Sequence, residues 1–90
     1  MRTNESPIHR QWTVRSPADV GRVLADLRAA WGITQETLAE EVGVDRSYLA
    51  RLEGGASTLA LERSLRALRR MGATIRIDAP VPDEDDGPSG

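Results

Sequence analysis

The chain has 90 residues, which is enough for one small domain. It contains no cysteine, and this excludes disulfides, thiolate metal sites and thiol catalysis. A second subunit is then the remaining support for so small a core. No apolar run is long enough to span a bilayer or to form a secretory signal, so we expect a cytoplasmic protein without a membrane partner.

Charge is distributed unevenly along the chain. The formal net charge is −2, but residues 80–90 contain Asp83, Glu84, Asp85 and Asp86 and no basic residue. The preceding 79 residues carry 12 arginines against ten acidic residues, a net charge of +2, which is compatible with nucleic-acid binding. We expect residues 80–90 to be a disordered acidic tail. It would be simply solubilising, or order on a basic partner, or screen the arginines and weaken nonspecific DNA binding.

Residues 1–15 are interpreted as an N-terminal arm with one short strand at residues 11–15, where Trp12 and Val14 alternate with a polar residue. Ser16 and Pro17 then begin a helix, because serine caps well and proline suits the first helical position. This first helix should end at Gly32. Its apolar stripe at helical spacing consists of Val20, Val23, Leu24, Leu27, Ala30 and Trp31.

Three more helices follow within a bundle that we assign to residues 16–72. Their predicted N-caps are Thr34, Asp45 and either Ser57 or Thr58, and their predicted ends are Gly43, Glu53 and Gly72. From Ala73 to Asp78 the hydrophobic period changes to two, which predicts a strand within residues 73–79 that Pro80 and Pro82 terminate. A lone strand has unpaired edges, so it needs a partner. Two candidates are open: the segment at 11–15, and the same strand of a second subunit.

Residues 35–52 carry the pattern of a DNA-binding helix-turn-helix. Its two helices cross closely, which requires a small residue at the fifth position, and its turn requires a residue tolerating positive φ at the ninth. Counted from Gln35 as the first position, the matching residues are Leu38 (fourth), Ala39 (fifth), Val42 (eighth), Gly43 (ninth), Val44 (tenth), Leu49 (fifteenth) and Leu52 (eighteenth). This agreement favours DNA binding over an ordinary helix pair whose spacing merely packs.

The polar positions of this motif give the candidate DNA contacts. The residues expected to contact base edges are Arg46, Ser47, Ala50 and Arg51. The residues expected to contact phosphates are Gln35, Asp45, Tyr48 and Ser57. An arginine can donate two hydrogen bonds to guanine O6 and N7. The alternative for each residue alone is a cap or a solvated surface side chain.

The stretch LRAAWGITQETLAEEVGVDRSYLARLEGG, from Leu27 to Gly55, resembles the XRE/Cro family of helix-turn-helix regulators. The resemblance implies an all-α, lambda-repressor-like bundle of four or five helices. It also places Arg28 and Glu53 at the positions of that family's internal arginine–glutamate ion pair. An acid at Asp45, close to DNA, departs from what a phosphate contact favours.

The chain most resembles the HipB-type antitoxins within that family, through Ser16-Pro17 at the start of the first helix and a terminal strand directly after Met71-Gly72. That resemblance implies a homodimer formed by the terminal strand, with contributions from Ala73, Thr74, Ile75, Arg76 and Ile77. It also implies repression of its own operon and binding of a HipA-like kinase toxin, although no toxin-contacting residue can be assigned.

We therefore expect a DNA-binding repressor, with three alternatives for its role: an autoregulating antitoxin, a stand-alone repressor, or a module that neutralises a protein partner and binds DNA weakly. Catalysis is not expected, since His9 is the single histidine and no second ligand or base accompanies it at useful spacing. We likewise expect no metal and no cofactor.

Overall fold

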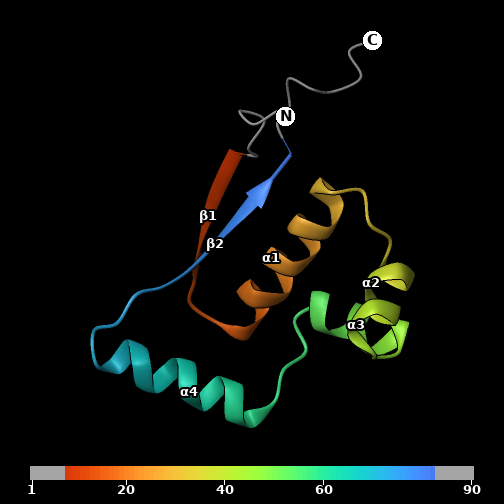
Figure 1. Cartoon of the computed structure of the whole chain (residues 1–90). Coiled ribbons are helices and arrows are strands. Elements are labelled where there is room, and N and C mark those ends of the chain that lie inside the picture. Colours follow the sequence, from red (N-terminus) through yellow and green to blue (C-terminus); the bar gives the residue numbers. More distant parts are fainter. Residues whose placement is uncertain (1–7, 83–90) are drawn as a thin grey trace.

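The structure, a computed structural model, describes residues 8–82. Along the chain, one strand comes before four helices and a second strand follows them. Figure 1 shows α1 at the centre of the arrangement. The elements in chain order are β1 (Ile8–Val14), α1 (Pro17–Ala30), α2 (Gln35–Val42), α3 (Arg46–Glu53), α4 (Leu59–Arg70) and β2 (Ile75–Val81). None of these described helices is long and apolar enough to cross a membrane.

The helix starts follow local capping chemistry. Ser16 Oγ accepts a hydrogen bond from the backbone N–H of Asp19, and the Asp19 carboxylate accepts one in return from the N–H of Arg15 at 2.7 Å. This hydrogen bond from Arg15 lowers the pKa of Asp19. At the starts of α2 and α4, Thr34 accepts from the N–H of Thr37 and Thr58 accepts from that of Leu61, so Thr58 rather than Ser57 caps α4. The prediction that the side chain of Asp45 caps α3 is wrong, because it makes no capping hydrogen bond.

The two strands form an antiparallel sheet within one chain, in which Val14 pairs with Ile75 and Trp12 with Ile77. The expected fold is therefore confirmed in part: the described residues form four helices and the C-terminal strand, but the term all-α is not exact, because that strand belongs to a two-stranded sheet. The first strand begins at Ile8, three residues before the segment that alternation indicated, because β2 supplies backbone partners along its whole length. Of the two candidate partners for the terminal strand, the structure shows the one in the same chain.

The prediction that Pro80 ends the terminal strand is also wrong. β2 continues to Val81, and Pro80 lies opposite His9 in the sheet. Proline is tolerated there because β2 is an edge strand. Every second residue of β2 points its backbone N–H away from β1, and at such a position the missing N–H of proline costs no hydrogen bond of the sheet. The expected disordered tail thus begins with residues that are in a strand. Its acidic residues 83–90 lie outside the described residues, as do residues 1–7 of the expected arm.

The core lies where the sheet, α1 and α4 meet. Val14, Val23 and Leu65 form its buried centre, one from each of these elements. Partly buried side chains packed around them are Trp12, Val20, Leu27, Leu61, Ile75 and Ile77. The α2–α3 pair packs on α1 from another side, so α1 contacts both the sheet and the helix-turn-helix.

Candidate nucleic-acid interface

The turn between α2 and α3 has the geometry that the sequence motif requires. Gly43 has a φ of 81°, in the left-handed region that favours glycine. The backbone N–H groups of Gly43 and Val44 both donate to the carbonyl of Ala39 at 2.9 Å. Ala39 and Leu49 are each only 2% exposed, so the small residue sits at the close crossing and the leucine anchors α3.

Gly21 marks a second close contact, between α1 and α3. A Cβ atom at this position would lie 2.1 Å from the carbonyl oxygen of Leu52 and 3.1 Å from that of Glu53. Only glycine lets the two backbones approach so closely. We did not predict this role, although a glycine inside an otherwise helical pattern is itself a signal of close packing.

Arg28 and Glu53 form a two-bond ion pair between α1 and α3. The Nε atom of Arg28 donates to one carboxylate oxygen at 2.7 Å, and Nη2 donates to the other at 3.0 Å. The side chains are 20% and 7% exposed. The hydrogen bond from Arg28 holds the pKa of Glu53 below its usual value, and the same bond raises the pKa of Arg28.

The same carboxylate also binds the start of α2. Gln35 Nε2 donates to Glu53 Oε1 at 2.9 Å, and Arg28 Nη1 donates to the carbonyl of Ile33 at 2.9 Å. Gln35 was expected to face a phosphate, yet its amide takes part in this internal network. The network therefore ties together α1, α3 and the loop that leads into α2.

The predicted base-contacting residues all lie in α3. Arg46, Ser47 and Arg51 are exposed, and Ala50 is half-buried. Among the described residues, these three exposed side chains make no hydrogen bond or ion pair within the chain. The structure thus leaves two guanidinium groups and one hydroxyl of a single short helix exposed, where they are available to a ligand.

The residues predicted to contact phosphates lie in different environments: Tyr48 is exposed beside an arginine, Asp45 begins α3, and Ser57 is half-buried. The guanidinium of Arg51 lies 5.9 Å from the ring centroid of Tyr48, which fits a cation–π contact. Asp45 begins α3 but its carboxylate makes no capping hydrogen bond, and it lines a shallow hollow with both of these side chains. Ser57 is half-buried and its hydroxyl donates to the carbonyl of Thr58 at 3.1 Å.

Residues expected at a dimer interface divide between a loop and a strand. Ala73 closes the turn after α4, because its N–H donates to the carbonyl of Leu68 at 2.9 Å, and Thr74 precedes the strand as well. Ile75, Arg76 and Ile77 lie in β2, where β1 occupies one of the strand's two sides.

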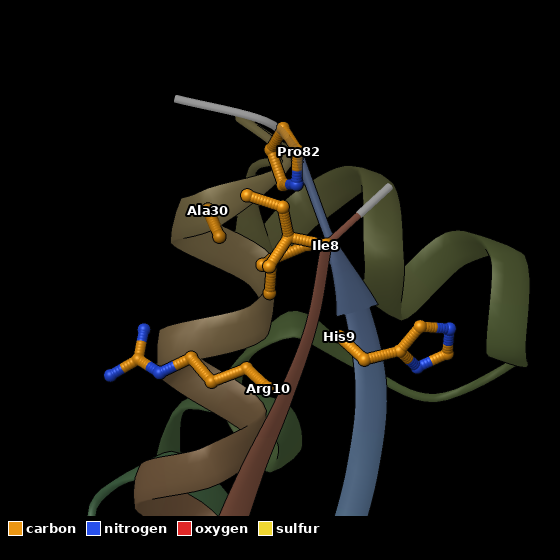
Figure 2. A pocket seen from close by; sticks show the side chains of 6 residues that line it. Ile8, His9, Arg10, Ala30 and Pro82 are labelled. Atoms are coloured by element: carbon orange, nitrogen blue, oxygen red, sulfur yellow. The ribbon is translucent and has the colours of Figure 1, made fainter. Parts of the chain in front are cut away.

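A hollow at the far end of the sheet lies well away from α3. Figure 2 shows Ile8, Ala30 and Pro82 around it, with Arg10 and His9 pointing to opposite sides of β1. His9 lies 3.4 Å from the carboxylate of Asp78 on the outer face of the sheet. This alternation fixes which side chains of the sheet face α1 and which face outward.

Comparisons with known proteins agree with this geometry. The helix-turn-helix domain family matches residues 19–80, which is more than half of the chain. An uncharacterized HTH-type transcriptional regulator of Sinorhizobium fredii, y4mF, is 31% identical over 67 residues; the match covers 74% of this chain and 88% of that protein. No solved structure matches significantly. The chain belongs to the helix-turn-helix domain family, and it is a DNA-binding transcriptional regulator.

Proposed function

We propose that this regulator is a homodimeric repressor that inserts α3 of each subunit into the major groove of a near-palindromic operator. The observation that carries the proposal is the construction of α3. Its exposed side chains include Arg46, Ser47 and Arg51, while Leu49 and Glu53 hold the helix against the rest of the domain. A helix held rigidly from behind loses little freedom when its polar face meets DNA.

The mechanism follows from charge and symmetry. Arginine forks that donate to guanine O6 and N7 would supply base discrimination, and contacts to phosphate would position the domain. Two symmetric recognition helices require half-sites about 34 Å apart. The bound dimer would occlude a promoter, acting by binding and not by catalysis, and its affinity would fall steeply with salt.

The test is a gel shift with the DNA upstream of the protein's own gene. The Arg46→Ala/Arg51→Ala variant should bind about 10- to 100-fold more weakly per arginine and should lose discrimination against mutated operators. The matched control is Arg10→Ala/Arg22→Ala, which removes the same charge from residues outside α3. If both double variants bind equally well, α3 is not the recognition helix.

We further propose that the repressor is the autoregulating antitoxin of a HipBA-like pair, and that its protein partner is a HipA-like kinase. Support comes from the Ser16-Pro17 start of α1 and from the strand that follows α4, features that it shares in sequence with HipB-type antitoxins. The kinase-like product of a neighbouring reading frame should copurify with the full chain and lose activity in the complex. A kinase that stays active and unbound would instead identify a stand-alone repressor.

A further inference from the structure

An open hollow of about 350 Å³ lies where the start of α1, the helix α4 and the loop after α3 meet. Three arginines line it, one before α1 and two on α4: Arg15, Arg66 and Arg69. The other lining residues are Ser16, Pro17, Ala18, Gly55, Ser57, Glu62 and Leu65. Glu62 is the single acid among them, so three cations against one carboxylate give the lining a net charge of +2.

The arginines of this hollow keep hydrogen-bond donors available. Arg69 Nη1 donates to the backbone carbonyl of Arg15 at 2.9 Å, and this bond holds the Arg69 guanidinium beside the start of α1. Among residues 8–82, the guanidinium groups of Arg15 and Arg66 make no hydrogen bond or ion pair, and Glu62 pairs with none of the three arginines. Like charges gathered around one hollow repel each other, and a bound anion would offset that repulsion.

The start of α1 adds a backbone donor to the same hollow. The N–H groups of a helix's first turn have no acceptor within the helix, and the positive end of the helix dipole lies there. Ser16 Oγ accepts from the N–H of Asp19, and Pro17 has no N–H. The N–H of Ala18 is therefore left without an acceptor among residues 8–82, and it supplements the charge of the arginines.

The hollow lies next to the helix that would enter the major groove. An added Cβ at Gly55 would meet the Cβ of Ala18 at 3.5 Å, so the loop after α3 contacts the start of α1. Gly55 follows Arg51 by four residues, which keeps the edge of the hollow within about 14 Å of a predicted base contact. Ser57, one of the predicted phosphate contacts, lines the same hollow. Since the major groove is about 12 Å wide, the sugar-phosphate backbone at its border comes within reach.

We propose that this hollow binds a phosphate group of the DNA backbone beside the groove that α3 enters, through the guanidinium groups of Arg15, Arg66 and Arg69. The inference rests on the proposed insertion of α3 and adds a contact made from outside the helix-turn-helix. Arginine donors match phosphate oxygens in paired hydrogen bonds. Because the backbone phosphate is the same at every base pair, the contact positions the domain and reads no sequence.

Arg15→Gln/Arg66→Gln in the full chain tests the site. Both side chains are exposed, so the variant should fold, and Arg69 is left in place because it holds the carbonyl of Arg15. Operator binding, followed by fluorescence anisotropy, should weaken about tenfold, and the slope of log K against log salt should fall by about 0.9 for one lost phosphate contact. Discrimination between the operator and mutated duplexes should stay unchanged. The matched control Arg63→Gln/Arg70→Gln removes the same charge from α4 outside the hollow and should keep nearly the full slope.

Ethylation of single DNA phosphates locates the contact. An ethyl group on the bound phosphate removes its charge, so it should weaken binding of the unchanged chain but not of Arg15→Gln/Arg66→Gln, which has already lost the contact. If this variant and the control bind with the same affinity and salt slope, the hollow holds no phosphate and the role of α3 stands. A variant that loses operator discrimination would also overturn the phosphate role. If the folded, unchanged chain binds no DNA, the proposed function itself fails.

Discussion

Gly21→Ala tests whether the close contact between α1 and α3 sets the stability of the domain. By helix propensity alone, alanine within α1 should be more stable than glycine by up to about 1 kcal/mol. The structure predicts the opposite sign. The new Cβ would lie 2.1 Å from the carbonyl oxygen of Leu52, and that obstacle is backbone, which cannot rotate away as a side chain can.

The magnitude follows from the required displacement. An ordinary contact begins at 3.4 Å, so α1 and α3 must separate by roughly 1 Å. Forcing extra volume into a packed contact costs about 1–3 kcal/mol, and a backbone obstacle places the cost at the upper end. Subtracting the propensity gain leaves a net loss of about 2 kcal/mol. For a domain of this size that corresponds to a fall in melting temperature of about 8–16 °C.

Thermal and urea unfolding, followed by circular dichroism, provide the assay. Arg22 lies next in α1 and is exposed, so Arg22→Ala and Arg22→Gly form the matched pair. There alanine should be the more stable of the two, whereas at position 21 glycine should be. The reasoning is refuted if Gly21→Ala melts at or above the temperature of the unchanged chain. Operator affinity should fall as well, because α3 carries the exposed arginines.

Three further predictions concern the ion pair and a helix cap. Glu53→Gln should lower the free energy of unfolding by about 3 kcal/mol in urea titration, because it leaves the guanidinium of Arg28 without its anionic partner. The folded state lowers the pKa of Glu53, so the stability from this pair is present above the unfolded pKa of about 4.5 and is lost as the pH falls through the lower folded pKa. Glu53→Gln should therefore reduce the loss of unfolding free energy between neutral and acid pH. If the dependence of the unfolding free energy on pH is unchanged in the variant, the ion pair is not its cause. Thr58→Ala should cost about 1 kcal/mol and Ser57→Ala less, since the hydroxyl of Thr58 alone caps α4; equal losses would contradict that assignment.

The parts of the fold that local chemistry determines were predictable. Thr34 and Thr58, the latter one of two candidates in the sequence, cap helices because their hydroxyls reach N–H groups three residues ahead. Gly43 closes the turn because glycine adopts the left-handed region without steric cost. The ion pair of Arg28 and Glu53 was inferred from family resemblance, and the structure brings the two side chains together. Each of these features depends on residues close in sequence or on a known motif.

The missed features depend on contacts between distant segments. Pairing of Ile8 with Val81 joins residues near the two ends of the chain, and alternation over residues 11–15 alone does not reveal its extent. Pro80 is a strand terminator by local chemistry, and only its place on an edge makes it compatible with β2. The role of Gly21 depends on a carbonyl of α3, and the internal use of Gln35 depends on Glu53.

The attachment of α3 to α1 at two points explains how a dimer built on the sheet would position its recognition helices. Gly21 and Arg28 are seven residues apart, so they lie on one face of α1, separated by about 10.5 Å along its axis. One point fixes the distance between the helices through backbone contact, and the other fixes their rotation through a two-bond ion pair. At its far end α1 is followed by Trp31, which bonds the edge of β2. These contacts link α3 through α1 to β2, so we expect loss of the ion pair to widen the range of half-site spacings that a dimer accepts and to weaken its binding.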